Sequence, residues 1–143
     1  MAVQSTASLP GDAGGRADEL HRRLTVVDGL NASWHLNPAV ADGLISGGVA
    51  AVHATVAANH DASWVLRTLS ALYEMIAGRP DIVVARSVAE IREARRTNRL
   101  AYVLGFQDTE PAGDDLGLFR LFHILGLRVV QLTYNFQNRV GCG

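Results

Sequence analysis

The 143-residue sequence has no lysine, a single cysteine and no long apolar run. Because all 13 basic residues are arginine, a Schiff-base lysine and a phosphate-loop lysine are excluded within it. The single cysteine, Cys142, excludes an internal disulfide framework and a cysteine-rich zinc module. No segment approaches the roughly 18 consecutive apolar residues of a membrane span, and residues 1–20 carry no apolar block typical of a secretory signal. We therefore expect a cytoplasmic protein without a membrane span.

The balance of charge and apolar residues describes a soluble globular protein. Hydrophobic residues make up 48% of the sequence, and 13 basic residues face 14 acidic ones. This content is too apolar for disorder, and the even charge predicts no nucleic-acid partner and no binding to a membrane surface. The length permits one domain of ordinary dimensions or part of a larger one.

Short β-branched runs alternate with longer helical stretches along most of the chain. Residues 1–18 are rich in Gly, Ser, Ala and Asp and are predicted to form a flexible tail. Strands are predicted over residues 24–28, 49–56, 100–106 and 129–134, with a short apolar run at 82–85, and helices over residues 38–45, 62–77, 88–97 and 116–125. The helix starts carry specific signals: Asn37-Pro38 is a cap followed by a first-turn proline, and Ser87-x-x-Glu90 is a capping box. The repeated β-α order predicts a parallel sheet with right-handed crossovers.

Candidate functional residues follow the predicted strands, because ligands of parallel sheets gather at the carboxyl ends of the strands. In chain order these residues are Asp28, Leu30, Ala32, His53, Gln107, Asp108, Tyr134 and Asn135.

Two segments resemble the renal (membrane) dipeptidase family of zinc peptidases. One is Leu100–Val140, LAYVLGFQDTEPAGDDLGLFRLFHILGLRVVQLTYNFQNRV, and the other is Val26-Val27-Asp28-Gly29-Leu30-Asn31. The first matches a family segment with a Gly-x-Glu-Gly-Gly strand end, an acidic loop, a helix and a strand ending in Leu-Thr. The resemblance covers nearly all of the part predicted to fold, which amounts to about half of a family member.

The resemblance implies a (β/α)8 TIM-type barrel with two zinc ions that hydrolyses dipeptides. We therefore expect residues 19–143 to form the amino-terminal half of such a barrel, about four β/α units, with residues 1–18 as a tail. Eight units need roughly 250 residues, and the chain stops in a predicted loop, so we expect a segment whose continuation is absent.

The family's metal ligands are replaced in this sequence. The family's His-x-Asp pair corresponds to Leu30 and Ala32, its bridging Glu to Gln107, and a later strand-end His to Tyr134. Leucine and alanine have no donor atoms, and a glutamine offers only a neutral carbonyl oxygen. No family metal ligand is therefore retained, and zinc, the cofactor implied by the resemblance, is not expected to bind this chain alone.

Two hypotheses for function remain open. The first is a dipeptidase-like metallohydrolase acting on a small peptide substrate, of which this chain is a partial barrel that is inactive alone. The second is a non-catalytic barrel that binds a small ligand or a partner protein. Gln107, Tyr134 and Asn135 are the candidate substrate-binding residues, and Asp28 with His53 is a candidate alternative polar site. Unpaired edges and an exposed barrel interior further predict self-association, so a homo-oligomer is a candidate state.

Each candidate also has a structural alternative. His53 can line the barrel with one hydrogen-bonding neighbour, Asp28 can accept backbone N–H groups at its strand end, and Gln107 can plug the mouth by bonding Tyr134 or Asn135. The pair His60-Asp61 is predicted to cap the following helix, as is Asp114 or Asp115. Trp34 and Trp64 are predicted to be packing aromatics, and Cys142 is given no nucleophilic role.

Overall fold

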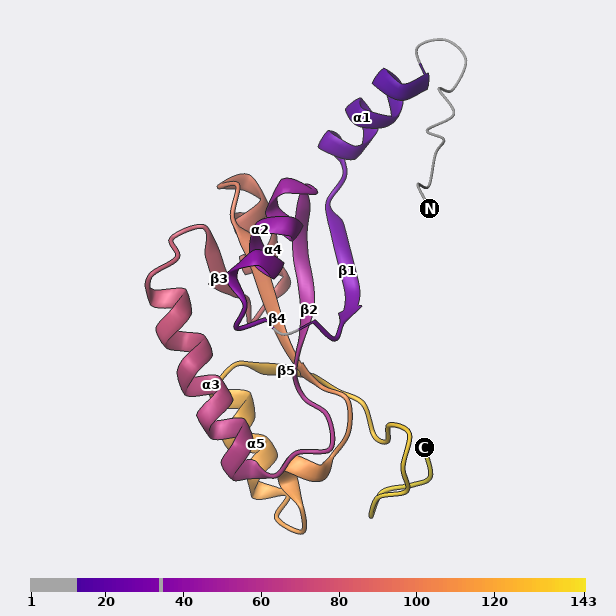
Figure 1. Cartoon of the computed structure of the whole chain (residues 1–143), viewed down its shortest axis with the longest axis vertical. Coiled ribbons are helices and arrows are strands. Elements are labelled where there is room, and N and C mark those ends of the chain that lie inside the picture. Colours follow the sequence, from indigo (N-terminus) through magenta and orange to yellow (C-terminus); the bar gives the residue numbers. More distant parts are fainter. Residues whose placement is uncertain (1–12, 34) are drawn as a thin grey trace, which may run out of the picture.

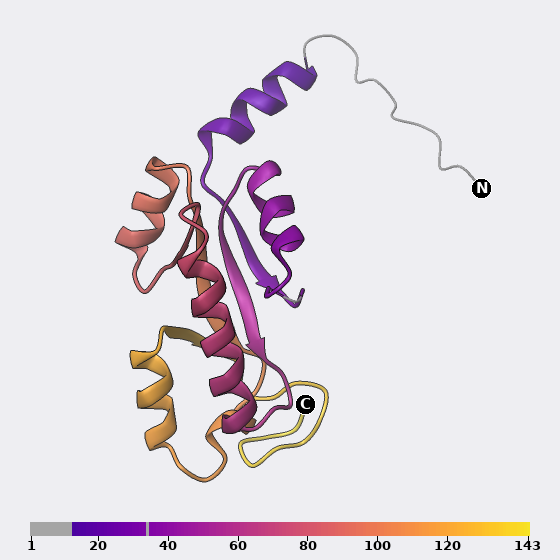
Figure 2. The same cartoon turned by 60° about the vertical axis from the view of Figure 1, so that its left-hand side comes forward.

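The computed structural model of the chain describes residues 13–33 and 35–143. Its elements are α1 (Ala13–Arg23), β1 (Val26–Asn31), α2 (Pro38–Ser46), β2 (Val49–Ala57), α3 (Ala62–Ala77), β3 (Ile82–Val84), α4 (Val88–Arg96), β4 (Leu100–Phe106), the 3-10 turn η1 (Glu110–Ala112), α5 (Gly117–Ile124) and β5 (Leu127–Val130). Helix α1 projects beyond the amino end of β1, while the other helices lie against the sheet (Figures 1 and 2). Among the described residues, no helix is both long and apolar enough to cross a membrane.

All strand pairs are parallel, which confirms the predicted sheet. Strands β1, β2 and β4 are neighbours in that order, and both β3 and β5 pair with β4. Strand β3 follows the first half of β4, where Val84 pairs with Tyr102. Strand β5 follows the second half, where Phe106 pairs with Val130. Strands β1, β2, β4 and β5 thus run side by side as an arc. The short β3 lies on the same side of β4 as β5, but pairs with the amino-terminal half of β4.

The strand order explains why α4 lies on the opposite face of the sheet from the other helices. The connections that lead from β1 to β2 and from β2 to β3 advance across the sheet, whereas the connection from β3 to β4 goes back one place. A right-handed crossover that reverses its direction must place its helix on the other face. Helix α4 accordingly packs against a small cluster formed by Ala51, Ala85, Ala94 and Ala101.

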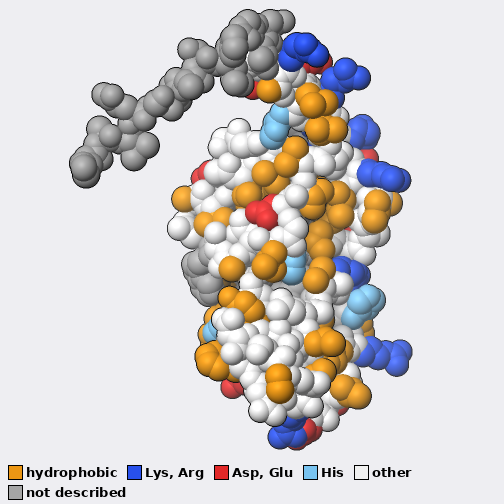
Figure 3. Space-filling view, turned by 90° about the vertical axis from the view of Figure 1, so that its right-hand side faces the viewer, with side chains coloured by type: hydrophobic (Ala, Val, Ile, Leu, Met, Phe, Trp, Pro, Cys, Tyr) orange, Lys and Arg blue, Asp and Glu red, His pale blue; other side chains and the backbone are white. Residues whose placement is uncertain are grey.

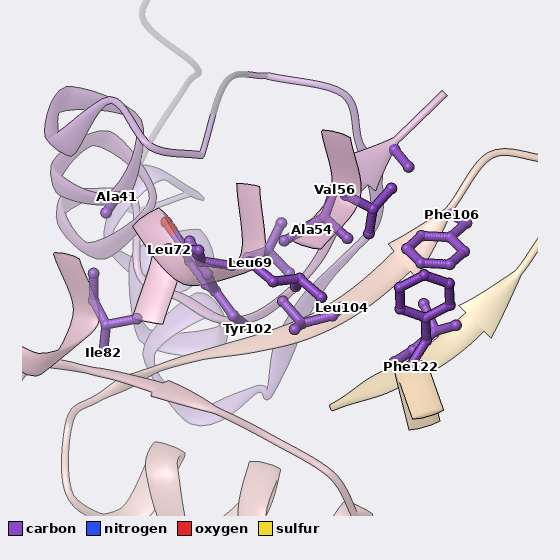
Figure 4. Close-up of a cluster of buried hydrophobic side chains, with 14 of the residues drawn as sticks. Ala41, Ala54, Val56, Leu69, Leu72, Ile82, Tyr102, Leu104, Phe106 and Phe122 are labelled. Carbon is purple, nitrogen blue, oxygen red and sulfur yellow. The ribbon is translucent and has the colours of Figure 1, made fainter. Parts of the chain in front are cut away.

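The main core fills the space between the sheet and the helices α2, α3 and α5. Alternate residues of β4 belong to this core, since side chains of a strand point to opposite faces in turn. The side chains of Leu100, Tyr102, Leu104 and Phe106 are all buried there. Phe106 meets Phe122 of α5 edge to face, with ring centroids 5.1 Å apart (Figure 4). We call the face with this core the helix face, and the face of Ala51 and Ala101 the inner face.

The predicted helix caps are confirmed. The side chain of Asn37 accepts a hydrogen bond from the Ala39 N–H and that of Asp61 from the Trp64 N–H. Ser87 accepts from the Glu90 N–H, while the Glu90 carboxylate accepts from the backbone N–H of Arg86. These caps satisfy backbone donors that the first turn of a helix leaves open.

The tail prediction is wrong for residues 13–18, because α1 begins at Ala13; residues 1–12 lie outside the described residues. Helix α1 has three basic residues in its last turn, which complement the negative end of the helix dipole. Its carboxyl end is fixed by His21 Nε2, which lies 2.9 Å from the Gly47 carbonyl oxygen, and by the guanidinium of Arg95, which donates to the Arg22 carbonyl.

Two strands, β1 and β5, differ from their predicted bounds by more than one residue. Strand β1 runs from Val26 to Asn31 rather than over residues 24–28. Strand β5 ends at Val130 rather than Tyr134, because its partner β4 ends at Phe106 and the last ladder bond is the one from the Gln131 N–H to the Phe106 carbonyl, at 2.9 Å.

Candidate functional site

Parallel pairing brings the carboxyl ends of the four arc strands to one rim of the sheet. Asn31 of β1 pairs with Ala54, Ala57 of β2 pairs with Phe106, and Phe106 in turn pairs with Val130 of β5. The end of the opening strand and the turn that holds Gln107 therefore lie on the same rim.

His53 lies on the inner face with its ring against the backbone of β4. Its side chain approaches Gly105 so closely that a Cβ added there would lie 1.7 Å from Nε2. Nδ1 is 3.0 Å from the Gly29 carbonyl oxygen. Because a carbonyl only accepts, we assign the proton to Nδ1, which leaves Nε2 as an acceptor. Nε2 is buried against the backbone of β4 and has no hydrogen-bond partner.

Gln107 is the first residue after β4 and is only 3% exposed. Its backbone N–H donates to the Ala57 carbonyl at 2.9 Å, and its side-chain Nε2 donates to Thr55 Oγ1 at 3.4 Å. The side-chain partner is therefore Thr55, and the predicted partners Tyr134 and Asn135 are wrong. They were predicted on the assumption that β5 extends to Tyr134, whereas the chain leaves the sheet after Val130.

A second polar group forms around Asp108, which is 1% exposed. One of its carboxylate oxygens accepts from the Asn59 N–H and the other from the Glu110 N–H at 3.0 Å, so it ties the β2–α3 loop to η1. A pocket of about 270 Å³ opens beside it. The pocket is lined by Asn59, Asp108, Glu110, Tyr134, Phe136, Gln137 and Asn138. Tyr134 thus joins Asp108 and Glu110 rather than Gln107, and Asn135 is not among the lining residues.

Asp28 and His53 do not form one site. Asp28 pairs in register with Val52, whose side chain belongs to the helix-face core, whereas His53 is on the inner face. The Asp28 carboxylate accepts from the Leu30 N–H at 3.2 Å and from Asn31 Nδ2 at 2.8 Å. This is the structural role considered for an aspartate at a strand end.

Sequence reasoning missed the importance of His35, which is 3% exposed. Its Nε2 lies 3.0 Å from the Asn31 carbonyl, and its ring meets that of Tyr102 edge-on, with centroids 5.2 Å apart. Burial lowers the pKa of His35, although the Asn31 carbonyl and the charge of Asp28 oppose this effect. His35 Nδ1 and the Tyr102 hydroxyl are buried without partners. In the sequence, only the position of His35 between the first strand and the Asn37 cap could have indicated that it is buried against Tyr102.

Burial has the opposite effect on Tyr102. Because the charged phenolate is poorly solvated in the core, burial raises the pKa of Tyr102 to about 12, while the charge of Arg79 acts weakly in the other direction.

Leu30, Ala32 and Gln107, the residues that the sequence resemblance assigns to the family's ligand positions, do not fit a metal centre. Leu30 is 52% exposed and carries no donor atom, Ala32 is exposed, and Gln107 is hydrogen-bonded to Thr55. Across residues 13–33 and 35–143, no group of three or more His, Cys, Asp or Glu side chains could hold a metal ion. We therefore derive no chemical step through zinc.

The remaining candidates have structural roles or are exposed. Asp61 caps α3, and the ring of His60 stacks on Trp64 at a centroid distance of 3.6 Å. Asp115 accepts from the first N–H of α5, at Gly117, whereas Asp114 forms an ion pair with Arg139. Cys142 is exposed, and Trp34 lies outside the described residues.

The fold and rim define the class of the protein: a parallel α/β chain whose strands form an open arc with functional candidates at the carboxyl rim. The model of the membrane dipeptidase family, peptidase family M19, matches residues 16–142. The chain belongs to this family. The predicted kinship is thus confirmed.

Solved structures support the same fold. An amidohydrolase from Pseudomonas aeruginosa is 30% identical with a TM-score of 0.82 over 88% of this chain and 39% of its own. A metallopeptidase from Rhodobacter sphaeroides, liganded with a phosphinate mimic of the dipeptide L-Ala-D-Ala, is 20% identical with a TM-score of 0.65 over 78% of this chain and 46% of its own. The probable dipeptidase PvdM from Pseudomonas aeruginosa is 16% identical with a TM-score of 0.77 over 91% of this chain and 39% of its own.

The chain spans less than half the length of these structures. It corresponds to part of a TIM-type barrel, as predicted. No curated protein matches the sequence.

Proposed function

We propose that the barrel to which this chain contributes acts on dipeptide amide bonds, and that the chain supplies the substrate side of the mouth rather than the metal centre. The observation that carries the proposal is the shared rim, where the ends of β1, β2, β4 and β5 meet in the arrangement expected from the family. A small peptide is the substrate class, in line with the dipeptide mimic bound by the Rhodobacter relative.

The rim of this chain is polar but uncharged where the family has its metal ligands. Thr55 offers a half-buried hydroxyl and Gln107 a neutral amide, both on the edge of the inner face. Such groups can hydrogen-bond the N–H and C=O groups of a peptide, but they cannot generate a nucleophile from water as a metal centre does. The chain alone is therefore inactive with zinc.

The test is an assay of the purified chain with a dipeptide panel that includes L-Ala-D-Ala, with added zinc and with a chelator. We expect no turnover above the buffer rate in either condition. Zinc-dependent turnover that the chelator abolishes would show that the chain holds a complete centre and would contradict this part of the proposal.

Recognition is tested separately by titrating the phosphinate dipeptide mimic into the chain under chelating conditions and following the imidazole resonances of His53 by NMR. We expect concentration-dependent shifts at His53 and none at His123, an exposed histidine on α5. If both rings are unperturbed at millimolar mimic, the rim does not recognise a dipeptide.

A non-catalytic binding barrel is the second candidate, and the replaced metal positions at Leu30, Ala32 and Gln107 favour it. Measurements on a form of the protein that carries the whole barrel distinguish the two candidates. Two bound zinc ions per chain would support the hydrolase, whereas peptide binding without metal or turnover would support the binding protein. Cytoplasmic location stays a prediction from the sequence.

A further inference from the structure

The two ring nitrogens of His35 have different surroundings. Nε2 lies 3.0 Å from the carbonyl oxygen of Asn31. Because a carbonyl only accepts, we assign the proton of the neutral ring to Nε2. Nδ1 is buried and has no hydrogen-bond partner among the described residues. The neutral ring therefore satisfies its one donor, and Nδ1 remains an unused acceptor.

A second proton on this ring has no partner. It would create an N–H group at Nδ1 and a positive charge on a residue that is 3% exposed. The ring beside it is that of Tyr102, which is 0% exposed and whose hydroxyl forms no hydrogen bond with Nδ1. Burying a donor without an acceptor is unfavourable, and so is burying a charge without a counter-charge. The contact between the two rings therefore suits only the neutral form of His35.

The charged groups that face His35 do not offset this cost. The charge of Asp28 on β1 favours the protonated ring, but the Asp28 carboxylate accepts hydrogen bonds from the Leu30 N–H and from Asn31 Nδ2. His53 on β2 opposes a second positive charge. Seen from the side of β1, charged side chains lie mostly at the margins of the molecule (Figure 3). Burial therefore prevails and lowers the pKa of His35.

The same contact fixes the first turn of α2. His35 and Leu36 attach this end of the helix to the core. The cap residue, Asn37, is exposed, and its hydrogen bonds go to the helix itself. Further along α2, Asp42 forms an ion pair with Arg79 at 2.7 Å, which holds the middle of the helix. Loss of the His35 contact would therefore loosen the first turn and leave the rest of α2 in place.

We propose that protonation of His35 releases its ring from Tyr102 and loosens the first turn of α2, so that this turn is fixed at neutral pH and open in mild acid. The released ring has the ordinary pKa of 6.5, whereas the pKa of the buried ring is lower. Below pH 6.5 the open state therefore binds more protons, and the ratio of open to fixed molecules should rise by up to about tenfold per pH unit. This end of α2 follows β1 at the carboxyl rim, so the change acts where the candidate ligand-binding residues lie.

Nuclear Overhauser effects between aromatic rings of the full chain test the release directly and need no variant. We expect the effect between His35 and Tyr102, whose ring centroids are 5.2 Å apart, to disappear as the pH falls from about 7.5 to about 4.5. The effect between Phe106 and Phe122, at 5.1 Å, should persist because that part of the core stays folded. If the first effect survives wherever the second does, or if both disappear together, the proposal is wrong.

Hydrogen exchange separates the titration of His35 from other effects of acid. The Val40 N–H donates to the Asn37 carbonyl in the first turn of α2, at 3.0 Å. Its protection factor in the parent chain should fall by up to about tenfold per pH unit below pH 6.5. In His35→Gln, whose amide can still donate to the Asn31 carbonyl but does not titrate, the protection factor should not depend on pH. The control His123→Gln, at an exposed histidine of α5, should behave as the parent does. An equal pH dependence in His35→Gln and in the parent would overturn the proposal.

Discussion

The contact between His53 and Gly105 shows how one side chain determines which residue its neighbouring strand can carry. The imidazole occupies the space that any side chain at position 105 would need, and this contact turns the unpartnered Nε2 toward the backbone of β4. A glycine within a buried strand has an entropic cost. Here the close approach of the ring accounts for it.

Gly105→Ala should therefore destabilise the protein by about 1–3 kcal/mol, because a Cβ 1.7 Å from His53 Nε2 forces the buried ring to move. Urea unfolding followed by circular dichroism measures this change. The control is Gly29→Ala, where a new Cβ meets nothing within 4 Å, and the double variant Gly105→Ala/His53→Ala should recover part of the loss. Equal losses at Gly29 and Gly105 would contradict the steric explanation.

Tyr102 predicts a specific loss of stability at alkaline pH. The unfolded chain releases the phenolic proton near pH 10.0, whereas the folded protein holds it until about pH 12. In that window the folded state binds more protons, so the free energy of unfolding falls with rising pH, by up to about 1.4 kcal/mol per unit. Tyr102→Phe should remove this part of the slope and, because the hydroxyl has no partner, should not destabilise the protein at pH 7.

The matched control is Tyr134→Phe, since Tyr134 lies at the rim and is only half-buried. Chemical unfolding at several pH values from 9 to about 12 provides the comparison. If Tyr102→Phe retained the full alkaline slope of the parent chain, burial of Tyr102 would not be its cause.

At the residue scale, the sequence predicted types of role better than partners. The caps Asn37, Asp61 and Ser87 were predictable because each depends on three or four consecutive residues. The partner of Gln107 was not, because Thr55 lies 52 positions away in the sequence. His35 was missed for the same reason, since its burial against Tyr102 depends on how the first loop folds over the sheet.

At the element scale, the best predictions are those of buried strands and capped helices. Strand β4 and helix α3 have the predicted bounds, because a continuous apolar run and a long amphipathic pattern each specify one structure. Strand β5 was placed too late in the chain because its apolar residues continue past the point where β4 ends as a partner. The position of α4 on the inner face follows from strand order, which the local pattern does not contain.

The loops of the rim are held together by Asp108, so we expect Asp108→Asn to destabilise the protein by about 2 kcal/mol. Its two carboxylate oxygens accept from two different backbone N–H groups, of Asn59 and Glu110. An amide would direct an N–H at one of those donors. Urea unfolding gives the change in free energy, and hydrogen exchange at Asn59 should accelerate. Asp114→Asn is the control, because that side chain is 70% exposed and its loss should cost less than about 0.5 kcal/mol.

At the scale of the whole molecule, the chain has the family's fold, and Leu30, Ala32 and Gln107 at its carboxyl rim carry no charged metal donor. Parallel pairing delivers position 30 and position 107 to the same edge, whatever side chains these positions carry. Fold and site are thus separable: register is fixed by buried residues of β2 and β4, whereas Leu30 and Ala32 at the rim are exposed and contribute little to the core.

This separation predicts that the donors can be restored. The variant Leu30→His/Ala32→Asp/Gln107→Glu should bind zinc at least about a hundredfold more tightly than the parent chain, because one imidazole and two carboxylates then face one rim. Isothermal titration calorimetry measures the affinity, and added zinc should raise the Tm, since a metal that binds only the folded state stabilises it. The control places the same residue types on three separate helices, as Val88→His/Ala71→Asp/Arg120→Glu, where they cannot converge. Equal zinc affinities of the two triple variants would show that positions 30, 32 and 107 do not share a centre, and the assignment of Gln107 to the bridging position would be lost with it.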